Sequence, residues 1–431
     1  MTVREWHKSK LVDVAAKKRW ALNGGPFGSK LSTKHYTESG VPVIRGTNLS
    51  AQSKFSFTDF VYVSEEKADE LRPNNAHPGD LVFTQRGTIG QVGLIPFDSS
   101  IPRFVISQSQ MKLTPDLEQA EPLFLYYYFS APGTVQKIQN LAFSAGVPHI
   151  NLEILRNFEV PLPPLTVQRR IAGILSAYDE LIENNQRRIK ILEEMARTLY
   201  REWFVHFRFP GHEKAKMARS PLGPIPEGWK VNKLGDLTAA LSRGISPTYD
   251  DEGGDSKIIN QKCIRDQRLS LEPARRQSKP IPPDKRIRFG DVLINSTGVG
   301  TLGRVAQVYE NLDQCTVDTH VTIVRSKADT DVDFFGCTLL LKQEDFERSG
   351  VGATGQTELS RTAIGEVKIP TPSDSLQKRF GVLAHPMRTA ANTLSKQTEN
   401  LRRTRDLLLP RLLSGAIELA GAGILATQEI A

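Results

Sequence analysis

The stretch VPLPPLTVQRRIAGIL, residues 160–175, returns later in the chain as IPTPSDSLQKRFGVLA, residues 369–384. Setting each residue beside the one 209 positions further on aligns 146–204 with 355–413 without a gap. The pairs that anchor this alignment are Gly146 and Gly355, Pro161 and Pro370, Gln168 and Gln377, Arg170 and Arg379, and Leu192 and Leu401. The chain therefore carries two copies of one unit.

The repeat reaches the front and the middle of each copy. Residues 6–13 match residues 229–236, and GDLVFTQRGTIGQV (79–92) matches GDVLINSTGVGTLGRV (290–305) across a two-residue gap. So long a period excludes a solenoid or propeller unit, which indicates that each copy is a whole domain with a connecting element. A duplicated domain that keeps its interface tends towards an approximate two-fold arrangement, which suits a target with two similar halves.

Composition indicates a globular protein of more than one domain, with 431 residues and 39% hydrophobic content. The net charge of +8 favours an anionic partner, most simply nucleic acid. The cysteines, Cys263, Cys315 and Cys337, lack CxxC spacing, so we expect neither a disulfide framework nor a zinc site. These features predict a protein of the reducing cytoplasm.

Nothing in the sequence is typical of membrane insertion or export. The first ten residues, MTVREWHKSK, have no apolar run, and the apolar segment 417–426 is short and contains Glu418. We therefore expect no membrane-spanning or targeting segment.

Short strands broken by Gly, Pro, Asn and Asp turns fill residues 41–160, and one helix near 122–140 interrupts them. The second copy repeats the pattern, with its helix near 333–349. Each copy then has a short helix capped by Asn151 or Ser360 and a strand that ends in Pro161 or Pro370. The predicted fold class is α+β, with two strand-rich domains that resemble each other.

A long helix follows each domain, because residues 168–204 contain neither proline nor a turn cluster and carry an apolar stripe over about four heptads. One such helix would pack on a core, but two in equivalent places favour two long antiparallel, coiled-coil-like helices packed on each other, with the domains at opposite ends. The predicted packing residues are Ile171, Ile174, Leu181, Leu192, Leu199, Phe380, Leu383, Leu394, Leu401 and Leu408.

Composition shifts divide the chain into four predicted segments. The first domain occupies 1–160 and the central helical spacer 161–210, and a linker with the second domain occupies 211–369. The second helical spacer occupies 370–431. The linker, 212–228, is rich in Pro, Gly and charge, as domain boundaries often are.

Motifs for catalysis are missing from the sequence. Two GxGxxG matches, at 298–303 and 350–355, lack the strand and helix that a dinucleotide loop requires, so we interpret them as turn glycines. No HExxH, nucleophile elbow, P-loop or (N/D)PP(Y/F) tetrapeptide occurs. We predict a binding protein with no catalytic residue, no metal site and no cofactor of its own.

Arg, Lys, Asn and Gln at strand ends and loops are the candidate DNA-reading side chains, because their forked or planar heads match base edges in the major groove. For any one of them the alternative is a solvated turn residue or a phosphate contact. The candidates are Arg45, Asn48, Gln85, Arg86 and Gln108 in the first copy, and Asn260, Gln261, Lys262, Arg265, Asn295 and Arg304 in the second.

Four stretches together resemble the specificity subunit of type I restriction-modification systems. They are GDLVFTQRGTIGQVGLI (79–95), the segment FEVPLPP through REWFVHF (158–207), PEGWKVNKLGDL (226–237) and LLLPRLLSGAIEL (407–419). The resemblance covers nearly the whole chain. One departure lies at the start of the second long helix, where Ser373 and Asp374 replace Pro164 and Leu165.

The resemblance implies two target recognition domains, each reading one half of a bipartite site in double-stranded DNA, with the two helices as a spacer. It also implies two methylation subunits as partners, which supply S-adenosylmethionine chemistry, and restriction subunits where the system has them. The alternative is an adaptor whose domains hold proteins rather than DNA. A self-contained methyltransferase or nuclease would need a catalytic motif that the sequence lacks.

Overall fold

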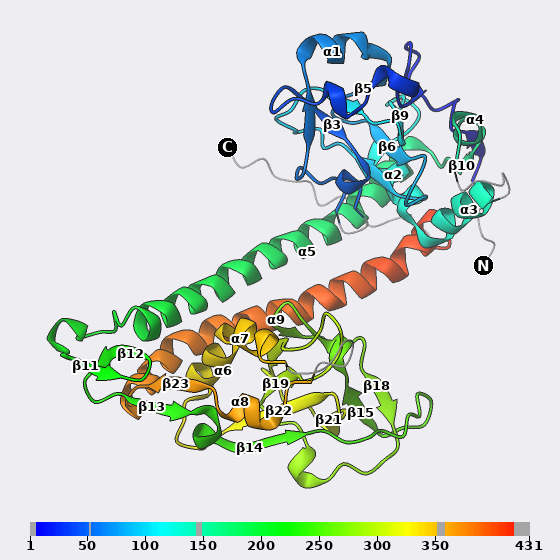
Figure 1. Cartoon of the computed structure of the whole chain (residues 1–431). Helices are drawn as coiled ribbons and strands as arrows, with labels where there is room; N and C mark the ends of the chain where they lie inside the picture. Colours follow the sequence, from blue (N-terminus) through cyan, green and yellow to red (C-terminus); the bar gives the residue numbers. More distant parts are fainter. Residues whose placement is uncertain (1–5, 51–52, 144–148, 351–357, 418–431) are drawn as a thin grey trace, which may run out of the picture. The chain divides into compact units, whose positions relative to one another are not determined.

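The computed structural model describes residues 6–50, 53–143, 149–350 and 358–417, which form two compact units. The first unit comprises residues 1–183 with 399–431, and the second comprises residues 184–398. Each unit holds the strand-rich domain of one copy together with parts of both long helices, α5 (Leu165–Tyr200) and α9 (Asp374–Leu413) (Figure 1). The division therefore runs through both helices and not at their ends.

Two four-stranded sheets form the domain of the first unit. The antiparallel sheet has the order β2-β9-β6-β7, and the second sheet, β4-β3-β8-β5, contains the parallel pair β3 and β8. The strands are β2 (Leu22–Gly24), β3 (Val41–Ile44), β4 (Val61–Val63), β5 (Asn75–Ala76), β6 (Leu81–Thr84), β7 (Val92–Leu94), β8 (Phe104–Ile106) and β9 (Gln110–Leu113). Leu81 and Phe83 of β6 join one core while Val82 joins another, which explains why this strand is apolar throughout.

The second unit repeats this plan. An antiparallel sheet has the order β14-β22-β19-β20, and a three-stranded sheet, β18-β15-β21, contains the parallel pair β15 and β21. The strands are β14 (Thr238–Arg243), β15 (Ser256–Ile259), β16 (Ile264–Arg265), β17 (Arg268–Leu269), β18 (Arg275–Gln277), β19 (Val292–Asn295), β20 (Val305–Gln307), β21 (Cys315–Val317) and β22 (Val321–Ser326), with β16 and β17 forming a hairpin. In β19, Val292 and Ile294 face one core and Leu293 another, as in β6.

The helix expected near 122–140 is wrong in one respect, because the structure has two helices there. After α2 (Pro122–Ser130) the backbone of Ala131 is extended, and α3 (Pro132–Phe143) begins at a proline that cannot continue the preceding helix. The second unit also has two helices here, α6 (Val332–Leu341) and α7 (Gln343–Arg348), but Lys342 separates them and no proline is involved. A further short helix of the first domain is α1 (Glu65–Glu70).

The expected helix caps are confirmed in both units. The side chain of Asn151 accepts the backbone N–H of Ile154 at the start of α4 (Leu152–Arg156), and that of Ser360 accepts the N–H of Ala363 at the start of α8 (Arg361–Gly365). A two-stranded pair follows in each unit. These pairs are β1 (Lys8–Lys10) with β10 (Glu159–Pro161), and β13 (Lys230–Lys233) with β23 (Lys368–Thr371).

A buried glutamine fixes the place where each long helix leaves its domain. The side chain of Gln168 accepts the N–H of Glu121 at 2.9 Å and donates to the carbonyl of Pro163 at 2.8 Å. Gln377 does the same in the second unit, with the N–H of Asp331 at 3.2 Å and the carbonyl of Pro372 at 3.1 Å. Although Ser373 and Asp374 depart from the first copy, α9 therefore begins at the residue equivalent to the start of α5.

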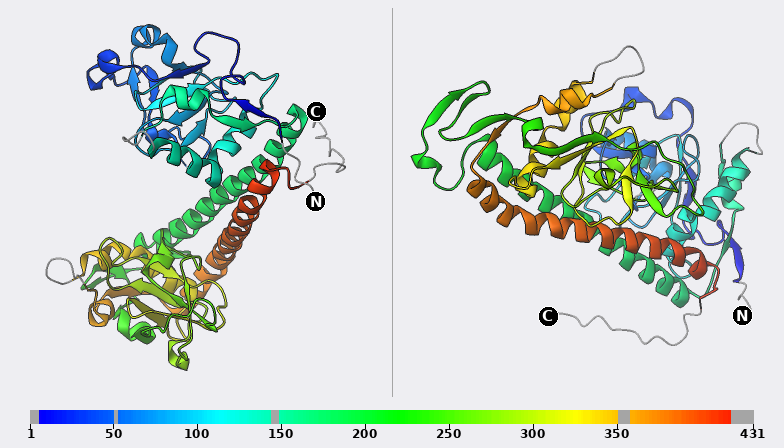
Figure 2. Two further views of the ribbon diagram at one scale, coloured as in Figure 1. Left: turned by 90° about the vertical axis from the view of Figure 1, so that its right-hand side faces the viewer. Right: turned by 90° about the horizontal axis from the view of Figure 1, so that it is seen from below.

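The two long helices pack antiparallel within each unit. In the first unit Ile171 and Leu175 of α5 lie in one core with Leu409, Leu412 and Leu413 of α9. In the second unit Ile189 and Leu192 pack against Ala391 and Leu394. The orange first half of α9 runs beside the green end of α5 in Figure 1 and in the right-hand view of Figure 2. A π turn, Arg201–Val205, closes α5 and adds Trp203 and Phe204 to a core with Phe380.

Most of the predicted packing residues of these helices are buried or half-buried, and two are not. Leu181 is 51% exposed and Leu383 is 45% exposed, which corrects the prediction for these two positions. Their chain neighbours Ile182 and Ala384 are buried instead. A helix of 3.6 residues per turn drifts from a strict heptad, so an extrapolated stripe selects the neighbouring residue. The eight that agree are Ile171, Ile174, Leu192, Leu199, Phe380, Leu394, Leu401 and Leu408.

The segment predicted as a linker forms a small hairpin of its own. Within it β11 (Met217–Ser220) pairs antiparallel with β12 (Gly223–Pro226). The three cysteines are free and buried, and burial raises the pKa of the Cys263 thiol to about 11. Among the described residues, no helix is both long and apolar enough to cross a membrane, and most of the segment 417–426 lies outside them.

Candidate nucleic-acid interface

Three strand ends of the first unit meet at one margin of its domain. Because β3 and β8 are parallel, their carboxyl ends lie together, and the N–H of Ser107 donates to the carbonyl of Ile44 at 3.0 Å. The end of β6 joins them, since the N–H of Gln85 donates to the carbonyl of Ser109 at 2.7 Å. We call this margin the first polar edge. Its predicted members are Arg45, Asn48, Gln85, Arg86 and Gln108.

The turn after β3 is held by Asn48, which is fully buried. Its side-chain oxygen accepts the N–H of Arg45 at 2.8 Å, and its side-chain amide donates to the carbonyls of Ser56 and Thr58 at 3.1 and 2.8 Å. Arg45 is half-buried and donates to the carbonyl of Asp59. Asn48 thus shapes the edge from inside, whereas Arg45 lies at its surface.

The rest of the first polar edge is more open. Arg86 is exposed and Gln85 half-buried at the end of β6. The side-chain amide of Gln108 donates to the carbonyls of Gly28 and Leu31 at 2.6 and 2.5 Å, so it holds the segment 25–31 against the edge. A Cβ at Gly25 would lie 2.1 Å from the carbonyl oxygen of Ser107, so this close approach requires glycine.

The second unit builds a matching margin, the second polar edge, from the ends of β15, β19 and β21. The N–H of Asp318 donates to the carbonyl of Ile259 at 2.9 Å, and that of Ser296 to the carbonyl of His320 at 2.8 Å. Burial raises the pKa of Asp318, whose carboxylate accepts the N–H of His320 and so shapes the turn. The predicted residues of this copy are Asn260, Gln261, Lys262, Arg265, Asn295 and Arg304.

Structural hydrogen bonds occupy several of these side chains. Asn295 is fully buried and donates to the carbonyl of Gln261 at 3.1 Å. Asn260 caps the turn after β15 by accepting the N–H of Lys262 at 2.9 Å, and Gln261 donates to the hydroxyl of Thr297 at 2.8 Å. Arg304 is half-buried and donates to the carbonyl of Gly300 at 2.7 Å.

Two of the predicted residues have exposed side chains in this region, and only one lies at the edge. Lys262 is exposed in the turn that follows β15. Arg265 is also exposed, but it lies in the hairpin of β16 and β17, whose residue Arg268 forms an ion pair with Glu193 of α5. Arg265 therefore lies on a hairpin that contacts α5, and not on one of the strand ends that form the edge.

Sequence reasoning missed several exposed residues of both edges. Phe27, which is 81% exposed, precedes the glycine that Gln108 holds, and Val299, which is 88% exposed, lies in the loop that Gln261 holds. The signal that could have found Val299 was its place between two glycines, because such a loop presents its one side chain outwards. The further exposed polar residues are Lys30, Lys34, Thr319 and His320.

The exposed side chains of these edges are of kinds that bind nucleic acid. Among the described residues, no group of three or more His, Cys, Asp or Glu could hold a metal ion. Of the two GxGxxG segments, the first is a turn with positive φ at Gly298, Gly300 and Gly303, and most of the second lies outside the described residues. Exposed Arg, Lys and amide groups beside exposed apolar side chains suit recognition of base edges and phosphates.

Comparison with known proteins supports this interpretation. The sequence matches the family described as type I restriction modification DNA specificity domain over residues 4–194 and 226–400. The MjaVIII specificity subunit of Methanocaldococcus jannaschii is 31% identical over 333 residues, which cover 73% of this chain and 75% of that protein. The MjaIX specificity subunit of the same organism is 23% identical and covers 96% of this chain and 94% of its own.

A solved structure shares the fold. The type I restriction-modification S subunit from M. genitalium matches with a TM-score of 0.64 at 18% identity, covering 96% of this chain and 98% of that chain. The family match spans most of this chain, and both of its copies are included. The chain therefore belongs to the DNA specificity subunits of type I restriction-modification systems.

Proposed function

We propose that each polar edge reads one half of a bipartite site in double-stranded DNA. The observation that carries this proposal is that the two edges share one construction but differ in side chains. Each has a parallel strand pair and a 3-10 turn after the first strand, at Gly46–Asn48 and Gln261–Cys263. Two domains with the same backbone arrangement but different polar side chains at the edge could read two different short sequences.

Exposure divides the predicted residues by role. We propose Gln85 and Arg86 of the first edge and Lys262 of the second as contacts to base edges or phosphates, with Arg45 and Arg304 beside them. Gln108 and Gln261 would act through the loops that they hold. We do not retain Asn48 and Asn295 as DNA contacts, because both are fully buried and hydrogen-bonded to backbone groups. We do not retain Arg265, because it pairs with Arg268 in the hairpin of β16 and β17 and does not belong to the strand ends of the edge.

The proposed partners follow from the family. Two methylation subunits would supply S-adenosylmethionine and the chemistry on adenine, and restriction subunits would cut foreign DNA where the system has them. This chain would add no catalytic group and no cofactor. We place the complex in the cytoplasm, with the DNA that it inspects.

The decisive experiment is a selection from randomised DNA with this chain co-expressed with the methylation subunit of its own system. Two short enriched blocks separated by a fixed unspecified gap would support one block per domain. A well-formed complex that enriches no sequence would overturn DNA reading and favour the adaptor. Because phosphate contacts release counterions, the affinity should also fall steeply with salt.

We further propose that the lengths of α5 and α9, 36 and 40 residues, set the gap between the two blocks. Deleting about one turn between Arg187 and Leu199 should change the preferred gap and leave both block sequences intact, since a turn of helix is about 5.4 Å long. Altered blocks with an unchanged gap would contradict this role of the helices.

A further inference from the structure

A cavity of about 360 Å³ lies inside the second unit. Its walls come from α5, the hairpin of β16 and β17, α6 and α9. Ala196, Leu340 and Ala391 give it apolar surface, and the thiol-bearing Cys337 and the guanidinium of Arg388 also line it. All of these residues belong to one compact unit, so the cavity does not depend on how the two units are arranged.

The repeat explains why the space exists. Cys337, Ala196 and Arg388 occupy in the second unit the positions that Tyr127, Arg405 and Asp179 occupy in the first unit. In the first unit the hydroxyl of Tyr127 donates to Asp179 at 2.6 Å, and Arg405 donates to the same carboxylate at 2.7 Å. A phenol ring and a guanidinium are thus replaced by a thiol and a methyl group, and a carboxylate is replaced by the larger guanidinium of Arg388. The three replacements together lose side-chain volume, which leaves space unfilled in the second unit.

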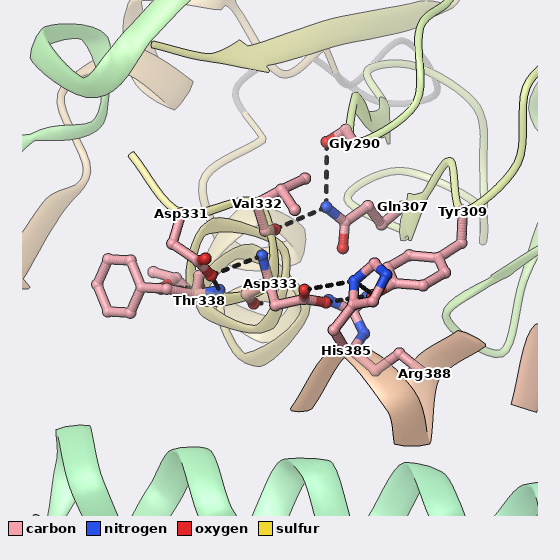
Figure 3. A network of polar contacts seen from close by, with 10 residues as sticks. Gly290, Gln307, Tyr309, Asp331, Val332, Asp333, Thr338, His385 and Arg388 are labelled. Atoms are coloured by element: carbon pink, nitrogen blue, oxygen red, sulfur yellow. Dashed lines mark hydrogen bonds and ion pairs between the residues drawn. The ribbon is translucent and has the colours of Figure 1, made fainter. Parts of the chain in front are cut away.

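Arg388 brings a buried positive charge to this cavity. Its side chain is 12% exposed, and its Nη1 lies 3.4 Å from Oδ1 of Asp333 (Figure 3). Asp333 is shared, because it also accepts the hydroxyl of Tyr309 and lies 3.0 Å from Nδ1 of His385. Among the residues that the structure describes, the hydrogen bonds of Arg388 start at Nη1 and go to Asp333, and its guanidinium lies over the ring of Tyr309, with Cζ 4.8 Å from the ring centroid.

The acidic residues around the cavity do not satisfy this guanidinium. Glu193 is held by two hydrogen bonds from Arg268, at 2.7 and 2.5 Å, and Glu310 lies 2.7 Å from Nζ of Lys396. Glu344 pairs with Arg348 at 3.0 Å, and Asp266 is exposed at the rim. Arg197 and Arg201 also line the cavity but are exposed, so the N–H groups of Arg388 are the less exposed charged donors that a ligand would meet.

We propose that this cavity binds a small molecule that has a planar apolar body and a carboxylate. The Nε and Nη2 edge of a guanidinium presents two parallel N–H groups, which match the two oxygens of a carboxylate. The body of the ligand fits against Ala196, Leu340 and Cys337. Such a ligand contacts both long helices and the recognition domain, so its binding stabilises the second unit. This inference does not depend on which residues read DNA.

Benzoate and its uncharged isostere benzamide test the proposal on the full chain. Titration calorimetry should show saturable binding of benzoate at least about tenfold tighter than that of benzamide, because only the carboxylate accepts both N–H groups as an ion. Benzoate should also raise the unfolding temperature of the full chain. Absence of saturable benzoate binding, or equal affinity for the two probes, would overturn the proposal.

Two variants locate the site. Ala196→Leu fills the cavity and should abolish benzoate binding, and retention of binding by the folded variant would place the ligand elsewhere. Arg388→Lys keeps the charge but loses the forked edge, so the preference for benzoate over benzamide should fall about tenfold. A merely structural role for Arg388 would lower the unfolding temperature without changing that ratio. Met195→Leu, at an exposed α5 position outside the cavity lining, is the matched control.

Discussion

The two units attach their domains to the long helices with opposite charges at equivalent positions. In the first unit α5 contributes a carboxylate, Asp179, which receives Tyr127 and Arg405. In the second unit α9 contributes a cation, Arg388, and the carboxylate, Asp333, comes from the domain instead. The same arrangement of elements therefore accepts opposite charges at equivalent positions, because in each unit a guanidinium still donates to a carboxylate.

What the two units keep in common is the buried glutamine. Gln168 and Gln377 are 0% and 2% exposed, and each joins the turn before its helix to the segment before α2 or α6. An amide side chain can accept and donate at once, so one residue satisfies backbone groups on both sides of the junction. This bond pattern is common to both units, whereas the ion pairs differ between them.

Replacing the two buried glutamines should have the largest effect, because both units share these residues. Gln168 makes three hydrogen bonds to backbone groups and Gln377 makes two. We expect Gln168→Leu to cost about 3 kcal/mol and Gln377→Leu about 2 kcal/mol, because buried backbone groups lose their partners. Urea unfolding of the full chain measures both. Gln136→Leu, at an exposed glutamine of α3, is the control. An equal loss in the free energy of unfolding for all three variants would contradict a shared structural role of Gln168 and Gln377.

Substitution of an exposed cation at either edge should affect recognition of only one half-site. We expect Arg86→Ala to weaken binding by about 2 kcal/mol and to relax only the block read by the first domain. Lys262→Ala should do the same for the other block. Selection from randomised DNA with each variant reads this out directly. Loss of both blocks with a single substitution would show that the edges do not act separately.

Alkaline pH should act on the buried tyrosines. Burial, and then the charge of Asp179, raises the pKa of Tyr127 above its ordinary 10.0. The folded state therefore favours the neutral phenol, a stabilisation present in full below the unfolded pKa and lost as pH rises above it. At about pH 11 the loss should be about 1 kcal/mol. Tyr127→Phe should flatten the fall in stability between about pH 9.5 and 11.

An equivalent substitution in the second unit tests whether a second buried tyrosine contributes to the same loss of stability at alkaline pH. Burial is also the largest cause that raises the pKa of Tyr309, whose hydroxyl donates to Asp333. Tyr309→Phe should likewise reduce the loss of stability of the second unit as the pH rises. An alkaline fall that is unchanged in both variants would mean that other groups dominate the titration.

The smallest expected effect belongs to the two exposed apolar side chains. Phe27→Ala and Val299→Ala should each weaken DNA binding by about 1 kcal/mol or less, because apolar side chains at the groove contact thymine methyl groups or base steps. Neither should change the free energy of unfolding, since both side chains are exposed. A measured loss of stability without loss of affinity would assign them to the fold instead.

The sequence by itself determined the elements whose causes are local. The duplication can be read directly from the repeated sequence. Short-range chemistry explains the long helices after Pro161 and Pro370 and the caps at Asn151 and Ser360, and the structure confirms these elements. The break between α2 and α3 was equally local, since Pro132 marks it, but the prediction passed over it.

Only the tertiary structure decided which polar residues line an edge and which lie under it. Asn48 and Gln85 look alike as candidates in the sequence, yet the first is fully buried and the second half-buried, because neighbouring strands and loops close over one and not the other. The cavity beside Arg388 was hidden for the same reason, since its walls come from residues as far apart as Ala196 and Ala391. Burial depends on contacts between segments distant along the chain, and no local pattern encodes them.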